Sequence, residues 1–243
     1  MKKSLLIAVL FGFLTVYALP GSRVYATPTV LSPGDIALVG FNFDDPDELA
    51  FVLLRSVGSG TQISFTDNGW LSSNAFRTGE GVFTWTAPSD LAAGTVVKPA
   101  VSGVAFSTSG DQILAYQGAA SNPTFIYALN SEEAGVWQST ATSSNSSALP
   151  RGLVNGTSAI ALNEVDNARY AGPTSGTRAA LLAAIGAPAN WTPNDISRVA
   201  VAGLVTLNGP AGLVTRLMSL GVQLAGAPMA ASKAARVPEV GPA

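Results

Sequence analysis

The chain contains no cysteine and no histidine among its 243 residues. The lack of cysteine excludes disulfide bonds, thiol catalysis and thiolate metal sites, so the fold must be stabilised by its hydrophobic core. The lack of histidine excludes Ser-His-Asp and Cys-His catalysis, and it leaves any zinc site with carboxylate ligands alone. The chemistry that remains is that of carboxylates and of hard cations with oxygen ligands.

Charged residues are also scarce, at 12% of the chain. There are 13 basic and 15 acidic residues, and three of the basic ones, Lys2, Lys3 and Arg23, lie within the first 26 positions. The next lysine is Lys98, and no basic cluster follows it. Nucleic acids and anionic lipids are bound by clusters of basic residues, so neither is expected as a partner.

Residues 1–26 have the pattern of a secretory signal peptide. Lys2 and Lys3 precede a short apolar stretch over residues 5–14, and Val24-Tyr25-Ala26 fits the small residues of a cleavage site. The apolar stretch is shorter than the roughly 20 residues of a membrane-spanning helix. We therefore expect a secreted, extracellular, cell-surface-associated protein whose mature chain begins at Thr27 and has no transmembrane segment.

Residues 27–207 are predicted to form one mainly β domain, an antiparallel immunoglobulin-like β-sandwich with one or two short helices. Short apolar or alternating segments are separated by clusters of Gly, Pro, Ser and Asn, which is typical of such a sandwich. One helix is predicted over Arg178–Ile185, capped by Thr177 and ended by Gly186. The predicted strands are 35–43, 49–54, 61–66, 82–86, 95–101, 112–116, 124–129 and 158–162, with a last one within 196–207.

Residues 208–243 are predicted to hold a short helix followed by a disordered tail. Leu213, Leu217, Leu220 and Leu224 follow the spacing of one helix face. That face either packs on the domain or serves association with another molecule. The last residues, 230–243, are rich in Ala and Pro, a composition typical of disorder.

Several motifs, taken in order, resemble a domain common in secreted bacterial surface proteins. They are Pro33-Gly-Asp-Ile-Ala37, Phe65-Thr-Asp-Asn-Gly-Trp70, Thr78-Gly-Glu-Gly81 and Trp85-Thr-Ala-Pro88. Such domains are similar to the lamin-tail immunoglobulin-like sandwich and, more distantly, to the subunits of extracellular tubules (cannulae) of some archaea. The resemblance implies a role at the cell envelope or extracellular matrix. For the cannula subunits it also implies self-assembly with calcium.

The loop after the first predicted strand carries four carboxylates, Asp44, Asp45, Asp47 and Glu48, in five residues. Like charges this close repel one another, and a cation relieves that repulsion. Calcium accepts six to eight oxygen ligands and suits an irregular loop. The two interpretations are a calcium site, with calcium as the one expected cofactor, and a solvated strand connection.

A second candidate site follows the strand 61–66. Asp67-Asn68-Gly69 fits a two-residue hairpin turn, but the residues after Gly69 do not alternate as a returning strand should. Residues 68–81 are therefore predicted to form a long loop, in which Asp67, Asn68 and Glu80 converge at one end of the sandwich. They either bind an ion together with residues 44–48 or clasp the loop, with Arg77 paired to Asp67 or Glu80.

Trp70 in this loop is a candidate platform for stacking on a sugar ring, whereas Trp85 in an alternating strand is expected in the core. The sequence thus predicts a non-enzymatic surface or matrix protein that acts by adhesion, through contacts with other surface proteins, with itself or with glycans. A carbohydrate-binding module is the alternative. A hydrolase using Asp67 and Glu80 as its two carboxylates is a third, less favoured reading.

Overall fold

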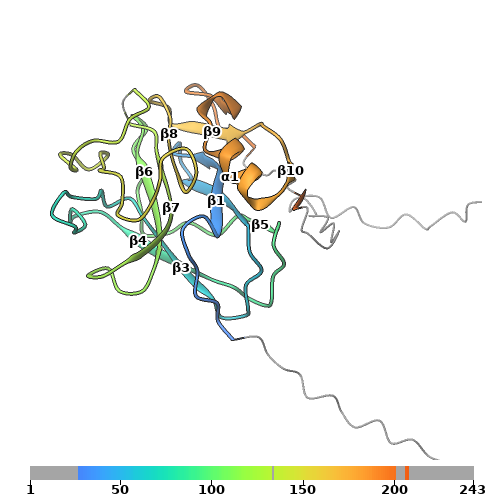
Figure 1. Ribbon diagram of the computed structural model, residues 1–243. Coiled ribbons are helices and arrows are strands. Elements are labelled where there is room, and N and C mark those ends of the chain that lie inside the picture. The colour runs from blue at the N-terminus through green and yellow to red at the C-terminus, as the bar shows by residue number, and fades with distance from the viewer. Residues whose placement is uncertain (1–26, 133, 201–205, 208–243) are drawn as a thin grey trace, which may run out of the picture.

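Two five-stranded sheets face one another in the computed structural model, which describes residues 27–132, 134–200 and 206–207 (Figure 1). The predicted signal peptide and the predicted tail helix lie outside these residues. The first sheet has the order β11 (Trp191–Pro193), β9 (Asn167–Tyr170), β1 (Ile36–Asn42), β2 (Glu48–Leu53) and β5 (Val96–Val97). The second sheet has the order β4 (Val82–Thr86), β3 (Gln62–Thr66), β6 (Gln112–Gln117), β7 (Thr124–Asn130) and β8 (Ala159–Ala161).

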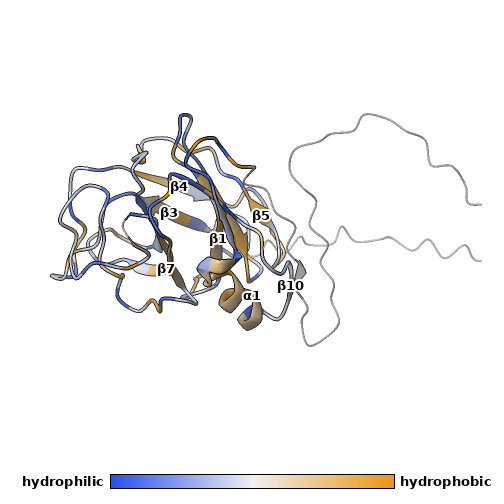
Figure 2. Cartoon of the chain, turned by 90° about the horizontal axis from the view of Figure 1, so that it is seen from above, coloured by the Kyte–Doolittle hydropathy of each residue, from blue (hydrophilic) through white to orange (hydrophobic). Residues whose placement is uncertain are grey.

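The space between the sheets is filled by the apolar residues that the strands direct inward. Ile63 and Phe65 on β3 alternate with polar neighbours, as expected for a strand with one buried face. Residues of β1 and β2 are buried almost throughout, on both faces of the first sheet. Figure 2 shows hydrophobic residues concentrated on the strands and many hydrophilic ones in the loops. The prediction of a mainly β sandwich is confirmed.

The strand pairing departs from a purely antiparallel sandwich in two places. Neighbouring strands of the first sheet are antiparallel, but β7 and β8 in the second sheet run parallel, so that sheet is mixed. A short parallel pair also joins β10 (Ser175–Gly176) to β12 (Thr206–Leu207). Residues 196–200 form no strand, so the predicted last strand reduces to β12 within the described residues.

The predicted helix is confirmed with its bounds. The segment α1 (Arg178–Ile185) begins after Thr177, whose hydroxyl accepts a hydrogen bond from the N–H of Ala180 at 3.2 Å. Leu181 and Ile185 of α1 are buried in the sandwich core. A short 3-10 turn, η1 (Pro188–Asn190), leads from the helix into β11.

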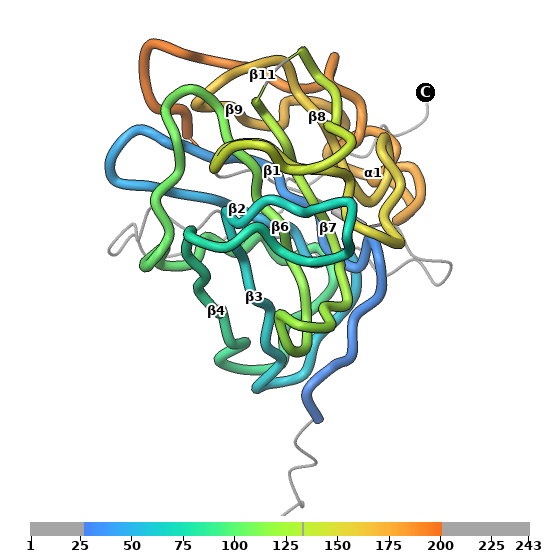
Figure 3. The backbone as a smooth tube through the Cα atoms, turned by 90° about the vertical axis from the view of Figure 1, so that its left-hand side faces the viewer, coloured from blue at the N-terminus to red at the C-terminus, as the bar shows by residue number. Residues whose placement is uncertain are grey.

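A second, smaller core lies on the outer face of the second sheet. Leu114 and Tyr116 from β6 and Phe125 and Ala128 from β7 point away from the sandwich interior. They are covered by loop residues, chiefly Trp70 from the loop between β3 and β4. Figure 3 shows this loop lying across β6 and β7. The loop is therefore packed against the sheet and has a fixed place in the fold.

Candidate functional site

The loop between β3 and β4 spans residues 67–81 and closes a hairpin, because Thr66 and Val82 are directly paired. The prediction of a long loop here is confirmed, and a two-residue turn at Asn68-Gly69 is excluded. Gly69 serves close packing: a Cβ atom at this position would lie 2.1 Å from the carbonyl oxygen of Ser146. Only glycine allows the loop to approach that backbone so closely.

Asp67 and Asn68 fasten the end of this loop to its beginning. The carboxylate of Asp67 accepts a hydrogen bond from the N–H of Gly81 at 2.7 Å, and Asn68 Oδ1 accepts one from the N–H of Glu80 at 3.2 Å. The amide group of Asn68 donates to the carbonyl oxygen of Gly81 at 2.9 Å. Arg77 pairs with Glu80 at 3.5 Å. These contacts agree with the interpretation that these side chains clasp the loop, with Arg77 paired to Glu80.

Three carboxylates from distant parts of the chain hold one short segment, in an arrangement that we call the carboxylate clamp. Asp67 accepts from the N–H of Ala105 at 3.0 Å, Asp47 from that of Phe106 at 3.1 Å, and Asp111 from that of Ser107 at 2.8 Å. Asp67 and Asp111 are almost fully buried. Buried backbone N–H groups need acceptors, and residues 105–107 obtain theirs from these side chains. Asp111 had not been predicted as a site residue.

The carboxylate clamp brings negative charges close together. Burial is the main cause that raises the pKa of Asp111, to about 8. The hydrogen bonds from the N–H groups of Ser107 and Gln112 lower this pKa, whereas the charges of Asp67 and Glu80 raise it. Burial also raises the pKa of Asp47, where the N–H of Phe106 acts in the opposite direction and the charges of Asp45 and Asp67 add to the rise. The protonated form of Asp111 is therefore favoured at neutral pH.

The acidic loop 44–48 is held by partners of its own. Glu48 pairs with Lys98 at 2.5 Å and with Arg198 at 2.6 Å. Burial acts to raise the pKa of Glu48, but these two cations and a hydrogen bond from Asn42 lower it overall. Asp44 accepts from the side-chain amide of Asn167 at 2.9 Å, and Asp45 is exposed.

The seven predicted metal ligands therefore do not meet as one set. Asp44, Asp47 and Glu48 are each bonded to a different partner. Asp67 and Asn68 are bonded to the backbone of the loop end, and Glu80 is paired with Arg77. Within the residues that the structure describes, no group of three or more acidic side chains is arranged to hold a metal ion. The predicted donor set, Asp44, Asp45, Asp47, Glu48, Asp67, Asn68 and Glu80, does not fit a single calcium ion.

The prediction of Trp70 as a sugar platform is wrong. Its side chain is 2% exposed, and its ring packs edge-on against Phe76 and Phe125 with centroids 5.1 and 4.8 Å apart. A side chain buried to this degree presents no face to a sugar ring. Asp67 and Glu80 are not placed as a hydrolase pair either, since both oxygens of Asp67 accept backbone N–H groups and Glu80 pairs with Arg77.

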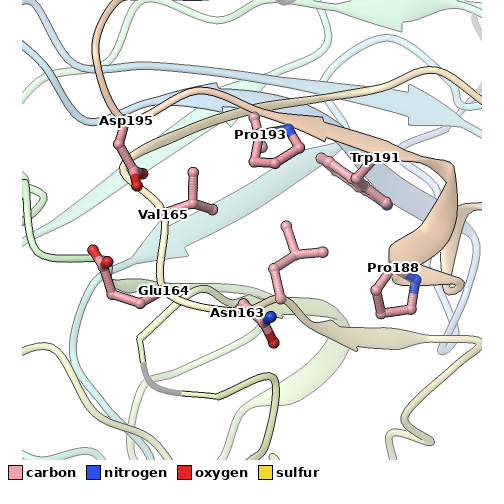
Figure 4. A pocket seen from close by; sticks show the side chains of 9 residues that line it. Asn163, Glu164, Val165, Pro188, Trp191, Pro193 and Asp195 are labelled. Atoms are coloured by element: carbon pink, nitrogen blue, oxygen red, sulfur yellow. The ribbon is translucent and has the colours of Figure 1, made fainter.

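A pocket that the sequence did not reveal lies beside Trp191, with a cavity of about 260 Å³ (Figure 4). Figure 4 shows the carboxylates of Glu164 and Asp195 at one end and Trp191 with Pro188 at the other. Burial and the charges of Asp195 and Asp166 raise the pKa of Glu164. We call this the Trp191 pocket; it is lined by Leu162, Asn163, Glu164, Val165, Ala168, Pro188, Trp191, Pro193 and Asp195.

The residues around this pocket carry weak sequence signals. β9 and β11 are only four and three residues long, so no run of alternating residues marks them. The one available hint is a pair of acidic-amide dipeptides, Asp166-Asn167 and Asn194-Asp195, at the ends of those strands. Asx residues often follow or precede strands for local hydrogen bonding alone, so that hint does not identify a site.

No family model, curated protein or solved structure matches the chain. The resemblance to lamin-tail-like surface domains therefore stays a prediction. Within the described part of the chain, no helix has the length and apolarity needed to cross a membrane.

Proposed function

We propose that the chain is a secreted, non-enzymatic protein of the cell surface or extracellular matrix that acts by binding a protein partner. The secretory pattern of residues 1–26 and the β-sandwich support this proposal. The observation that carries it is the Trp191 pocket, in which two carboxylates stand beside an apolar floor. Such a site is suited to recognition by shape and charge.

The pocket suits a lysine or arginine side chain of the partner. At about 260 Å³ the cavity is smaller than the usual range for small-molecule sites, roughly 300–1,000 Å³, and it has room for one long side chain. The aliphatic stem of such a residue covers apolar surface such as Val165 and Pro193. Its charged end then lies beside Glu164 and Asp195, as long cationic side chains prefer.

A glycan is the less suitable occupant. Stacking on a sugar needs an exposed aromatic face, and Trp191 is only 7% exposed. Its indole N–H is also engaged, donating to the carbonyl oxygen of Ile185 at 2.8 Å. The carboxylates remain available for sugar hydroxyls, so glycans form one arm of the test below.

The binding proposal is tested by titrating the mature chain with short capped peptides while its indole N–H signals are followed by NMR. The peptides Gly-Lys-Gly and Gly-Arg-Gly at millimolar concentration are expected to shift the Trp191 signal, which Trp191→Phe identifies. Gly-Gln-Gly serves as the uncharged control. The double variant Glu164→Gln, Asp195→Asn is expected to weaken binding about fivefold, because two exposed charges are lost.

Asp90→Asn provides a matched control, since Asp90 is an exposed aspartate of another loop. Equal shifts with the glutamine peptide, or no shift with any peptide, would contradict the proposal. A response to neutral oligosaccharides alone would replace it with the carbohydrate-binding alternative.

The proposed location is tested separately, by recovering the protein from the outside of the producing cell and sequencing its N-terminus. We expect the recovered chain to start at Thr27. An intact Met1 on protein retained inside the cell would remove the secreted part of the proposal.

A further inference from the structure

The two five-stranded sheets end in four edge strands, β5, β11, β4 and β8, and three of these are protected against pairing with a further strand. β5 is two residues long and is followed by Lys98 and Pro99. Shortness, lysine and proline all hinder pairing at a sheet edge. β8 is covered by a turn of its own chain, in which Ala159 donates its N–H to Val154 at 3.1 Å and accepts from Gly156 at 2.8 Å.

The edge formed by β11 is protected by a lack of donors. On its outer side Pro193 has no N–H, and the N–H of Trp191 donates to the carbonyl oxygen of Pro188. A strand that pairs with an edge needs both donors and acceptors there, so proline at this position prevents a regular ladder.

The fourth edge strand, β4, carries none of these protections along residues 82–86. It is five residues long, and its pairing with β3 is regular, without a bulge. Residues 81–89 carry no charge, and their one proline, Pro88, lies beyond the strand. Native proteins normally protect edges of this kind, because exposed backbone groups there template the addition of another strand.

The backbone N–H and C=O groups of Thr84 and Thr86 point outward from this edge. The N–H of Ala87 donates to the carbonyl oxygen of Thr61 at 2.8 Å, and hydrogen-bonded pairs alternate along antiparallel strands. Residues 83 and 85 therefore bond to β3, and residues 84 and 86 face away from it. In the part of the chain that the structure describes, no other segment bonds to the backbone of Thr84 or Thr86.

The side chains of this stretch are uncharged. Thr84 and Thr86 are exposed on the outer face of the second sheet. Trp85 points to the inner face, where its ring packs edge-on against Phe51 with centroids 5.2 Å apart, yet it stays partly exposed. Gly103 lies close to the preceding residue pair, Gly81 and Val82, so the accessible part of the edge is residues 84–86.

We propose that β4 pairs with β4 of a second copy of this chain, in antiparallel direction and about a twofold axis at Trp85. In this register Thr84 lies opposite Thr86 of the second copy, and each such pair exchanges two backbone hydrogen bonds. The two outward N–H groups of each copy then meet the two outward carbonyl oxygens of the other. The two Trp85 residues face each other across the axis, which covers the part of each side chain that is exposed in one copy.

The sequence of the edge favours a second copy as the occupant. Thr84-Trp85-Thr86 reads the same in both directions, so antiparallel pairing about Trp85 brings matching residues together. A twofold dimer needs a surface that is complementary to itself in this way. The chain has a formal net charge of −2, but residues 81–89 have no charge, so like charges do not oppose one another directly across this edge.

The proposed dimer leaves the Trp191 pocket untouched. That pocket lies beside β11 and the end of β8, whereas β4 is the opposite edge of the second sheet. The inference goes beyond the proposed function and does not depend on it.

The test measures association of the mature chain by sedimentation velocity from about 10 µM to about 1 mM. A short strand pair is a smaller interface than those of stable complexes, so we expect a reversible dimer with a Kd of about 100 µM. The amide N–H of Thr84 should exchange with solvent more slowly as the concentration rises. Thr84→Pro removes an outward N–H without removing a bond to β3, and it is expected to weaken association about tenfold or more.

Thr84→Lys provides a second variant, in case Thr84→Pro fails to fold. It places like charges close to the axis and is also expected to weaken association about tenfold or more. Thr124→Lys, at an exposed position of β7, should associate as the wild type does. A wild type that stays monomeric at about 1 mM, or a dimer that persists in the folded variants at Thr84, would overturn the proposal. Neither result bears on the peptide shifts at Trp191, so the two proposals fail independently.

Discussion

The carboxylate clamp and the surroundings of Asn167 use aspartate side chains in opposite ways. In the clamp, each of Asp47, Asp67 and Asp111 accepts at least one backbone N–H, so donors and acceptors are matched. Around Asn167, the carboxylates of Asp44 and Asp166 and one carbonyl oxygen share the two hydrogens of its side-chain amide, while the amide oxygen has no donor. Donors and acceptors are therefore matched in the clamp and unmatched around Asn167.

The largest expected effect is the loss of Asp67, which would show how much the clamp contributes to stability. Asp67→Ala leaves the N–H groups of Gly81 and Ala105 without their acceptor, and each hydrogen bond to a charged group contributes about 1.5–3 kcal/mol. We expect the free energy of unfolding to fall by about 3 kcal/mol in urea denaturation followed by circular dichroism. Asp67→Asn, which keeps one acceptor, should lie between the alanine variant and the wild type.

Glu80→Gln is the matched control for that measurement. Its partner Arg77 lies 3.5 Å away, and both side chains are partly exposed. The free energy of unfolding should therefore fall by less than about 1 kcal/mol. If Asp67→Ala and Glu80→Gln lowered the free energy of unfolding by similar amounts, the hydrogen bonds of Asp67 to the clamped segment would not contribute more to stability than an exposed ion pair does.

An effect of comparable size is expected from pH, again at the clamp. The pKa of Asp111 is about 8 in the folded chain against an ordinary value of 3.8, so the folded state binds the proton more tightly than the unfolded one. The stability due to Asp111 is therefore highest below pH 4 and is lost as the pH rises from about 4 to about 8. Asp111→Asn should remove this dependence.

The measurement is the Tm of wild type and Asp111→Asn at pH 5 and pH 8. The Tm of the wild type should fall by about 10 °C more than that of the variant over this interval. Asp90→Asn, at an exposed position, should follow the wild type. Parallel profiles for wild type and Asp111→Asn would mean that Asp111 stays ionised throughout.

The sequence was most informative where segments are long and periodic. The strands β1 to β4, β6 and β7 and the helix α1 with its Thr177 cap are predicted close to their bounds. Alternation marks β3 and β4, and continuous apolar runs bounded by turn residues mark the strands that are buried on both faces. β9 and β11 were missed, since three or four residues are too few to show a period. The candidate sites depend on long-range pairing, which local patterns do not contain.

The acidic residues illustrate this limit. Asp67, Asn68 and Glu80 were correctly predicted to lie together, because one loop joins them. That Asp47 and Asp111 reach the same segment, 105–107, follows only from the arrangement of both sheets. Trp70 was misassigned as a platform because its neighbours in sequence are polar, while its neighbours in space are Phe76 and Phe125.

The carboxylate clamp also sets which substitutions residues 105–107 can accept. The clamp bonds to the backbone N–H groups of these residues and not to their side chains. The residue type at each position is therefore limited by packing and not by the clamp. Proline alone lacks the N–H group that the clamp needs. Among homologous chains, positions 105 and 107 should therefore drift in composition, while position 106 stays apolar because Phe106 is buried against Phe43. Proline should be excluded at all three positions, and Asp47, Asp67 and Asp111 should change rarely and together.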